Sequence, residues 1–389
     1  MTTDAPVPAS APLRLGLFYG AVFLALGIYG PFWPLWLKAQ GLTPEQIGLV
    51  FALGTLAKVT VNPFAARAAD RSGRRKRLLV GLTLAAAIAF ALFAVTESLA
   101  AILLVSVLYF VCWGPIMPLT ESLTMLTRAR RPFDYGRVRL WGSVTFIAGA
   151  YGMGLALTDA PVAWTHGAIL GAVVLAFLAA LALPDTPGPK TEPGSRPFRE
   201  VLRLPGLFAA VMAATCVQAS HSVYYGFSSL HWRNAGHGPD VIGALWAEGV
   251  IVEILLFACA AAAVRRVGAL NLILLGSAAA VLRWLVTGET TDLAWLIAVQ
   301  ALHALTFGAT HLGIIHLIAE RASPALSATA QSTYAMALGL GSAAVTYGAG
   351  WLFAALQGGA FLAMAGLAFI GILFGGIAYL ADNRRAISR

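Results

Sequence analysis

The sequence predicts an all-α polytopic membrane protein with twelve transmembrane helices in two pseudo-symmetric six-helix halves. Apolar residues make up 59% of the 389 residues and charged residues only 11%, whereas roughly a quarter of a soluble chain is charged. Apolar runs of about 20 residues follow one another, and each is long enough to cross a ~30 Å hydrocarbon core. A β-barrel is excluded because its strands would alternate in short segments of about 10 residues.

Twelve apolar runs define the predicted spans. They cover residues 13–37, 44–66, 77–96, 99–127, 137–158, 162–183, 205–232, 239–263, 269–287, 292–319, 326–354 and 358–381. The first run is too long for a signal peptide and continues as a spanning helix, so no cleavable signal is expected. Cys112, Cys216 and Cys259 all fall inside spans without CxxC spacing, and we expect them to be small buried hydrophobes.

A long connection near the middle of the chain predicts the two halves. Residues 184–204, "PDTPGPKTEPGSRPFREVLRL", are rich in Pro, Gly and charge, and we expect them to link residues 1–183 to residues 205–389. Nearly all of the 26 Lys and Arg residues lie in the tails or in the connections of one face. The exceptions are Lys38, Lys58, Arg233 and Arg283. This bias predicts cytoplasmic termini and a cytoplasmic linker, for a protein of the inner cell membrane.

The two halves repeat one another at an offset of about 195 residues. "PEQIGLVFALG" (44–54) aligns with "PDVIGALWAEG" (239–249), and the same offset places Gly73 on Gly268 in the loops after spans 2 and 8. Six helices lie within the offset, so the repeats share one orientation. The sequence therefore predicts a parallel duplication.

With these spans and this repeat, the chain resembles a transporter of the major facilitator superfamily. The loop "ARAADRSGRRKRL" (66–78) resembles the superfamily signature G-x-x-x-D-R-x-G-R-R, with Ala66 in place of the first glycine. The matching residues are Asp70, Arg71, Gly73, Arg74 and Arg75. Gly73 allows a tight turn, and Asp70 can cap a neighbouring helix and pair with arginines. The resemblance implies that this loop gates the conformational change.

Four further stretches resemble the phenylpropionate-permease-like branch of the superfamily, which is related to lactose permease and the oligosaccharide:proton symporters. They are "GPFWPLWLKAQGLTPEQIG" (30–48), "FDYGRVRLWGSV" (133–144), "YYGFSS" (224–229) and "ALHALTFGATHL" (301–312). The resemblance covers the whole chain and implies a cavity lined by spans 1, 4, 7 and 10. A drug antiporter would carry a proline in span 5, and "GSVTFIAGAYGMG" (142–154) has none, which disfavours that activity.

Charged side chains inside the predicted spans are the main functional signal. Each costs ~2.5–3.5 kcal/mol at the membrane centre, so each needs a partner or a water-filled cavity. The charged candidates are Lys58, Glu121, Arg139, Glu248, Glu253 and Arg283, and the histidines are His221, His303, His311 and His316. Both halves contribute, as an alternating-access cavity at their interface requires.

Arg139 and Glu121 are expected to meet across adjacent helices, because each lies roughly 10 Å from the cytoplasmic edge at 1.5 Å per residue. Arg137 lies about 200° from Arg139 around the helix, and we expect it to be a cytoplasmic surface charge. The resemblance to lactose permease implies that the Arg139–Glu121 pair binds substrate. A snorkelling interfacial arginine and a structural ion pair remain the alternatives.

Glu253 in span 8 is the favoured chemical residue of its helix. It falls on Lys58 under the repeat, which gives a charge-reversed pair of symmetry-related positions. The span-8 glutamate of lactose permease matches Val250 here, one helical step from Glu253 on the same face. Glu248 lies about 140° around the helix from Glu253, and it is either a cavity wall or a helix contact.

His303 and Arg283 match residues of lactose permease, which implies roles for both in proton coupling. Arg283 would then set the proton affinity of a neighbour, and His303 would also contact substrate. The carboxylate that follows the histidine in that protein is Thr306 here. This difference leaves the proton to Glu121, Glu253 or a histidine, with His311 as a secondary candidate.

Polar and aromatic side chains complete the predicted substrate site. In the span-7 stretch "QASHSVYYGFSS" (218–229), the resemblance favours His221 and Tyr225 as substrate contacts over interhelical packing. Span 1 adds Tyr19, Phe23 and Trp33. Trp113, a further substrate candidate, and Pro118 interrupt span 4, which suits a helix that bends. An aromatic wall beside a buried arginine suits a small ring-bearing anion.

The sequence favours a proton-coupled symporter that imports a small organic solute, such as an aromatic carboxylate. A sugar or nucleoside:proton symporter stays open, because the Arg139–Glu121 pair can also bind hydroxyl groups. An efflux antiporter is less favoured, as is a sensor, which would carry a large extramembrane domain. An enzyme is not expected, because HExxH and GxSxG motifs with partners are absent from the sequence.

The expected partners are a small-molecule substrate, protons and the lipid bilayer, and the protein is expected to act as a monomer. The net charge of +9 is assigned to membrane topology, so nucleic acid is not expected. The sequence has no phosphate-binding loop, so we do not expect ATP to drive transport, and we expect no cofactor. No metal is expected either, since the span-10 histidines lie 8 and 5 residues apart instead of four.

Overall fold

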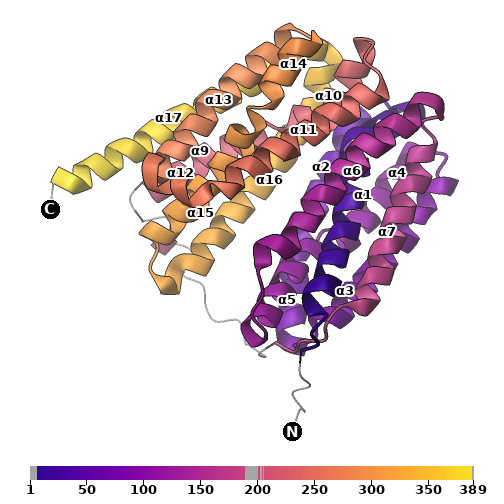
Figure 1. Cartoon of the computed structure of the whole chain (residues 1–389). Coiled ribbons are helices and arrows are strands. Elements are labelled where there is room, and N and C mark those ends of the chain that lie inside the picture. The colour runs from indigo at the N-terminus through magenta and orange to yellow at the C-terminus, as the bar shows by residue number, and fades with distance from the viewer. Residues whose placement is uncertain (1–6, 189–199, 202–203, 205, 388–389) are drawn as a thin grey trace. The chain divides into compact units, whose positions relative to one another are not determined.

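The computed structural model describes residues 7–188, 200–201, 204 and 206–387, and these residues form helices without a strand (Figure 1). Up to residue 188 the elements are α1 (Ala11–Ala39), α2 (Pro44–Ser72), α3 (Arg75–Ala91), η1 (Leu92–Val95), α4 (Leu99–Trp113), α5 (Ile116–Arg130), α6 (Tyr135–Asp159) and α7 (Trp164–Ala182). From residue 206 onward they are α9 (Leu207–Ala219), α10 (Ser222–Asn234), α11 (Pro239–Ala258), α12 (Ala260–Val267), α13 (Ala269–Glu289), α14 (Leu293–Gln300), η2 (Ala304–Ala309), α15 (Thr310–Arg321), α16 (Pro324–Leu356), η3 (Gln357–Gly359) and α17 (Ala360–Ile387).

The helices confirm the predicted membrane architecture. Eleven stretches of the described chain are long and apolar enough to cross a membrane. The last stretch, Thr329–Asp382, has 54 residues, which at 1.5 Å per residue is more than twice a ~30 Å core. Gln357, at φ 50°, ends α16, and α17 begins after the turn η3. This stretch therefore holds two spans, and the described residues contain the twelve spans that the sequence predicts.

Two helices extend furthest beyond the ends of the predicted spans. The predicted ends at residues 66 and 381 are early, because α2 continues to Ser72 and α17 to Ile387. Both extensions carry charged residues, which leave the membrane but still form helix.

Several spans consist of more than one helix. In span 4 the chain turns at Gly114–Pro115, between α4 and α5, because proline has no N–H to continue the helical ladder. The break follows Trp113 and lies four residues before Pro118, which has no N–H to donate to the Gly114 carbonyl, so the predicted interruption of span 4 is confirmed. Pro118 lies in the first turn of α5, where N–H groups have no intrahelical partner. In span 10, residues 304–309 form the π-helix η2, a rare form that is frequent at functional sites.

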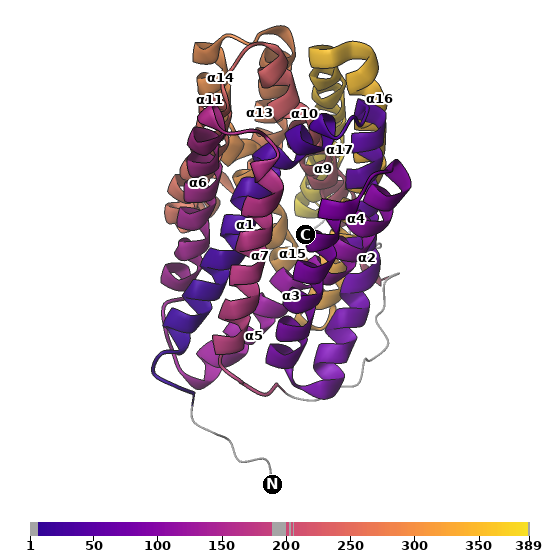
Figure 2. The same ribbon diagram turned by 90° about the vertical axis from the view of Figure 1, so that its right-hand side faces the viewer.

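Close helix packing defines the N-terminal unit. It contains Met1–Leu42 and Leu53–Gly194. In Figures 1 and 2, α1 runs beside α6 and α7, and α3 also contacts α4, α5 and α7. A Cβ at Gly27 of α1 would meet the backbone of Phe146 of α6, so only a small residue allows this approach. Thr145 Oγ1 adds a hydrogen bond of 2.7 Å to the Gly20 carbonyl.

An apolar core around α9 defines the C-terminal unit. This unit contains Thr43–Ala52 and Ser195–Arg389. Helix α9 contacts α13, α15, α16 and α17. Buried residues of this core include Leu207, Ala210, Ala214, Ile273, Ile314, Leu317, Ala330 and Ala378. Packing around one central helix positions the polar residues of α10, α13 and span 10 described below.

The predicted linker, 184–204, falls largely outside the described residues. Its first part, residues 184–188, follows α7 and packs on the N-terminal unit. The hydroxyls of Thr127 and Thr186 lie 2.9 Å apart, and the Gly188 N–H donates to the Gly73 carbonyl at 3.0 Å. The division into halves at this linker stays a prediction.

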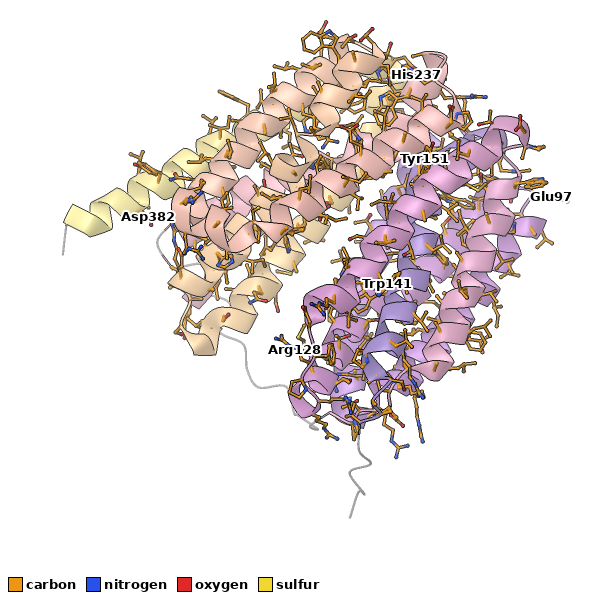
Figure 3. All side chains as sticks on the ribbon, viewed as in Figure 1. Glu97, Arg128, Trp141, Tyr151, His237 and Asp382 are labelled. Atoms are coloured by element: carbon orange, nitrogen blue, oxygen red, sulfur yellow. The ribbon has the colours of Figure 1, made fainter. Side chains whose placement is uncertain are left out.

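Labelled residues mark the two ends of each unit. In Figure 3, Glu97 and Arg128 lie at opposite ends of the N-terminal unit, and His237 and Asp382 lie at opposite ends of the C-terminal unit. Arg128 belongs to the last turn of α5, next to the basic loop that we expect to be cytoplasmic. Which side of the membrane each end faces stays a prediction.

The prediction for the cysteines is partly wrong. Cys216 is buried and Cys112 is half-buried, but Cys259 is exposed. Cys259 lies at the break between α11 and α12, where its backbone leaves the helical region at φ −104° and ψ 7°. The break interrupts the packed helix face, so an apolar sequence context does not bury this residue.

Candidate functional site

The first polar cluster lies in the N-terminal unit, around Arg139. Its Nε lies 3.6 Å from Oε1 of Glu121, so the two side chains meet as the sequence predicts. The hydroxyl of Tyr135 donates to Oε2 of Glu121 at 2.8 Å. Each carboxylate oxygen of Glu121 therefore has a partner from α6.

The guanidinium of Arg139 lies over aromatic rings of α1. Its Cζ is 4.1 Å from the ring centroid of Phe23 and 5.6 Å from that of Tyr19, both within the reach of a cation–π interaction. Gly142 makes room for this arrangement, since a Cβ there would meet Nη1 of Arg139 and the Phe23 ring. The Arg139 side chain stays 30% exposed, so the cation is held in place and still accessible.

Helix α6 separates Arg139 from Arg137, as expected. Asp134 caps α6 by accepting from the Arg137 N–H at 3.2 Å, and its other oxygen lies 3.4 Å from Arg137 Nε. The Arg137 side chain is 87% exposed. The cap sets where the helix begins, and Arg139, two residues further on, contacts α1 and α5.

Tyr19 is buried beneath Arg139. Its hydroxyl lies 3.2 Å from Thr124 Oγ1, and Thr124 donates its own proton to the Thr120 carbonyl at 2.8 Å. Tyr19 is therefore the donor to Thr124. Tyr19 has no exposed surface in this structure, and its direct contact with substrate stays a prediction.

Tyr135 was not identified from the sequence. It lies beside Arg137 and Arg139 in "YGRVRLWGS" (135–143), at the first position of α6. A tyrosine one turn before an intramembrane arginine is the only signal there. Its role at Glu121 becomes visible only when α5 and α6 pack together.

Lys58 is the second cation of the N-terminal unit. Its Nζ lies 5.2 Å from the ring centroid of Phe110. Gly114, at the break in span 4, accommodates the lysine stem, because a Cβ there would lie 2.6 Å from Lys58 Cγ. Among the described residues of this unit, no carboxylate lies within 4 Å of the Lys58 ammonium.

Two aromatic residues that we expected in the substrate wall pack inside the N-terminal unit instead. Trp33 is 1% exposed, and its ring stacks on Trp36 with centroids 4.4 Å apart. Trp113 is 6% exposed and stacks on Tyr109 at 5.6 Å. Rings from α1, α3, η1 and α4 fill this interior, so these side chains serve packing in the structure.

The second polar cluster lies in the C-terminal unit, around the buried Arg283 of α13. Its Nη1 donates to His303 Nδ1 at 2.9 Å and to Thr306 Oγ1 at 3.0 Å. Its Nη2 donates to Gln300 Oε1 at 2.6 Å. The guanidinium also lies 4.6 Å from the ring centroid of Trp284. Arg283 has no exposed surface, so these neighbours replace water around its charge.

Gln300 was also missed by reasoning from the sequence. While its Oε1 accepts from Arg283, its Nε2 donates to the Tyr224 hydroxyl at 3.0 Å and to the Leu245 carbonyl at 2.7 Å. Gln300 thus joins α14 to α10, α11 and α13. A single polar residue at the end of the apolar run "LAWLIAVQ" (293–300) is the only signal in the sequence.

The contacts of His303 fix its tautomer. A guanidinium only donates, so Nδ1 accepts from Arg283 and the ring proton of the neutral imidazole lies on Nε2. Nε2 is 3.9 Å from Oε2 of Glu253 on α11. The two residues that we expected to take part in proton coupling are therefore neighbours.

His221 carries its ring proton on the other nitrogen, Nδ1, and contacts Thr306 through Nε2. Its Nδ1 lies 3.0 Å from the Val217 carbonyl, which only accepts, so Nδ1 carries the proton. Its Nε2, 3.0 Å from Thr306 Oγ1, then accepts from the threonine hydroxyl. His221 is fully buried in this structure, and its contact with substrate stays a prediction.

The remaining candidates of the C-terminal unit are more accessible. The ring of Tyr225 is stacked on His221 at 5.7 Å, and Tyr225 is 41% exposed. Glu248 and Glu253 are half-buried, and Glu248 interacts electrostatically with Arg283. The exposed His311 stacks on Phe307 at 6.3 Å. Within the described chain, no group of three or more His, Cys, Asp or Glu residues is placed to hold a metal ion.

The loop between α2 and α3 forms the predicted turn. Gly73 has φ 66°, a conformation that favours glycine. Asp70 Oδ1 lies 2.7 Å from Nη2 of the buried Arg75, whereas Arg71 and Arg74 are exposed. Asp70 thus pairs with an arginine as expected but does not cap α3, which begins without a side-chain cap. The gating role of this loop stays a prediction.

Known proteins match the chain over most of its length. A family model described as "MFS_1 like family" matches residues 13–366. A probable 3-phenylpropionic acid transporter of Escherichia coli (strain K12) is 35% identical over 362 residues, which cover 90% of this chain and 93% of that protein. Lactose permease of Klebsiella oxytoca is 25% identical over 328 residues, or 78% of each chain.

A solved structure of a point mutant of the nucleoside transporter NupG has a TM-score of 0.84 to this chain. The match covers 94% of this chain and 99% of that one, at 16% identity. At that identity the likeness shows a shared fold alone.

Proposed function

The chain belongs to the MFS_1-like family and is a multi-pass membrane transporter of the major facilitator type, and on this premise we propose that it imports a small aromatic carboxylate together with protons. The observation that carries the proposal is the accessible Arg139 guanidinium, held over Phe23 and beside Glu121. Similarity to a probable 3-phenylpropionic acid transporter supports 3-phenylpropionate as the first candidate substrate.

The Arg139 cluster suits an aromatic acid for two reasons. A guanidinium binds a carboxylate through parallel N–H groups, which gives both affinity and orientation. The aromatic rings of α1 beside it offer apolar surface to the ring of such an acid. Glu121, which takes Tyr135 and Arg139 at its two oxygens, fixes the position of the cation.

Glu253 is the proposed proton carrier. It is half-buried and lies beside the neutral His303, behind which Arg283 is buried. A proton on Glu253 would remove one negative charge from the interior of this unit. Glu121 is the weaker candidate, because both of its oxygens already have partners, Arg139 and Tyr135.

In the proposed cycle, a proton binds at Glu253 and substrate binds at Arg139 from the outside, and the two halves then rock to release both inside. The loop with Asp70 and Arg75 acts as a gate in this movement. We also propose that the protein is a monomer in the inner membrane, and the Lys and Arg bias favours cytoplasmic termini.

A sugar or nucleoside:proton symporter is the second candidate. Similarity to lactose permease favours it, and Tyr135, Glu121 and Arg139 together offer donors and acceptors to hydroxyl groups. On this alternative the aromatic rings of α1 would stack on a sugar or base instead of a phenyl ring.

Uptake into proteoliposomes tests the proposal. Labelled 3-phenylpropionate, lactose and uridine are offered at an inward proton gradient, with and without a protonophore. We expect only the aromatic acid to accumulate, and the accumulation to collapse with the protonophore. Because the undissociated acid also crosses lipid, protein-free vesicles and the Arg139→Gln variant provide the background. Accumulation that the protonophore leaves unchanged contradicts proton coupling, and accumulation of lactose or uridine alone supports the second candidate.

A further inference from the structure

Away from the ends of the spans, the charged side chains differ in sign between the two units. The N-terminal unit holds Lys58, Arg139 and Glu121, and the C-terminal unit holds Arg283, Glu248 and Glu253. His221 and His303 add no charge, because each accepts a hydrogen bond at one ring nitrogen. With the acids and bases ionised, the N-terminal interior carries one net positive charge and the C-terminal interior one net negative charge.

Lys58 accounts for the excess positive charge. Arg139 has Glu121 at 3.6 Å, whereas Lys58 has the ring of Phe110 at 5.2 Å and, in the described part of its unit, no carboxylate within 4 Å. Gly114 makes room for its stem, so the lysine is built into the fold at this point. A charge inside a span is costly without compensation, and an anion near Lys58 is therefore favoured.

We infer that the substrate carboxylate, bound at Arg139, offsets the excess positive charge that Lys58 gives to the N-terminal unit, and that one carboxylate therefore moves with one proton and without net charge. This inference rests on the proposed function. A bound carboxylate brings the net charge of the N-terminal interior to zero, and one proton on Glu253 or Glu248 brings the net charge of the C-terminal interior to zero. The empty interior also sums to zero across the two units. Carboxylate alone or a proton alone leaves a net charge in the membrane, which disfavours reorientation and enforces coupling.

The membrane potential tests this charge balance. Full-length protein in proteoliposomes receives a fixed inward proton gradient, and potassium with valinomycin sets the potential at about 0 or about −100 mV inside. One elementary charge across 100 mV is worth ~2.3 kcal/mol, or about a 50-fold change in accumulation. We expect accumulation of 3-phenylpropionate to agree within about twofold at the two potentials. A change near 50-fold in either direction would overturn the inference.

Variants of Lys58 test its part in recognition. Lys58→Met removes the charge, Lys58→Arg keeps it, and Lys38→Met in the exposed last turn of α1 is the matched control. Tryptophan fluorescence measures the binding of 3-phenylpropionate and of the neutral 3-phenylpropanamide. We expect the wild type, Lys58→Arg and Lys38→Met to prefer the acid by about tenfold or more. Lys58→Met should lose most of this preference, because the remaining cation, Arg139, already has Glu121 as its partner.

The outcomes separate this inference from the proposed function. A wild type that does not accumulate the acid under a proton gradient contradicts the proposed function itself. Accumulation that follows both the gradient and the potential contradicts only the charge balance. A structural role for Lys58 would weaken acid and amide together, and a retained preference for the acid in Lys58→Met overturns its assignment. If that variant does not fold, the potential dependence of the wild type decides.

Discussion

In the C-terminal unit, Nη1 of Arg283 lies 2.9 Å from Nδ1 of His303, and this contact makes the imidazole an acceptor toward a buried cation. The remaining ring proton lies on Nε2, 3.9 Å from Oε2 of Glu253. A neutral ring thus lies between the guanidinium and this carboxylate. A change in the charge of Glu253 therefore alters the electrostatic environment of His303 and, through it, of Arg283. These contacts link the proposed proton site to the buried network.

Thr306→Val should weaken this network. Valine keeps the shape but removes the hydroxyl that accepts from Arg283 and donates to His221, and each buried group left unpaired costs ~1–3 kcal/mol. We expect a lower melting temperature in detergent and slower proton-driven uptake. Thr333→Val is the matched control, because the Thr333 hydroxyl donates to the Thr329 carbonyl within α16. Equal losses in both variants would contradict a special role for Thr306.

Gln300→Leu should be more damaging, because it removes hydrogen bonds to three partners. Arg283 loses an acceptor, and the Tyr224 hydroxyl and the Leu245 carbonyl each lose a donor. At ~1–3 kcal/mol for each group, we expect a marked fall in the yield of folded protein and in melting temperature. Gln331→Leu, on an exposed position of α16, should be close to neutral. A Gln300→Leu variant as stable as this control would show that the network does not hold the helices together.

Arg139→Gln should abolish uptake, whereas Arg137→Gln should keep most of it. Arg139 is the cation against Phe23 and Glu121, and Arg137 is exposed and pairs with Asp134. Uptake is compared at equal amounts of membrane-inserted protein. Equal loss in the two variants at normal expression would contradict the separate roles.

Gly27→Ala should loosen the contact between α1 and α6. The added Cβ would meet the Phe146 backbone, which cannot rotate away as a side chain can, and such overpacking costs ~1–3 kcal/mol. We expect a melting temperature lower by several degrees. Gly152→Ala on α6 is the control, because nothing lies within 4 Å of its added Cβ and alanine favours helix. The prediction is wrong if the two variants have the same melting temperature.

The twelve helices could be predicted because composition and span length decide membrane architecture almost alone. The meeting of Arg139 and Glu121 could also be predicted, since residues at equal depth on adjacent helices lie close together. His303 and Glu253 lie next to each other, as the proton-coupling role that we predict for both suggests, although nothing in their spacing requires it.

Other features depend on packing that spacing does not reveal. Gln300 is an ordinary residue in an apolar run until Tyr224, Leu245 and Arg283 converge on it from three helices. The π-helix over residues 304–309 could not be predicted, because no proline or glycine pair stands at its start. From the sequence, Trp33 could face either the substrate cavity or the packed interior, and only the structure places it among buried rings.

Simultaneous measurement of proton and substrate fluxes tests the central claim most directly. Proteoliposomes in weak buffer, with valinomycin and potassium to dissipate the potential, receive labelled 3-phenylpropionate from outside without an initial pH gradient. The account predicts that the medium becomes more alkaline in step with uptake, by one proton for each acid, above the background set by Arg139→Gln. Uptake above that background without any alkalinisation of the medium would contradict it.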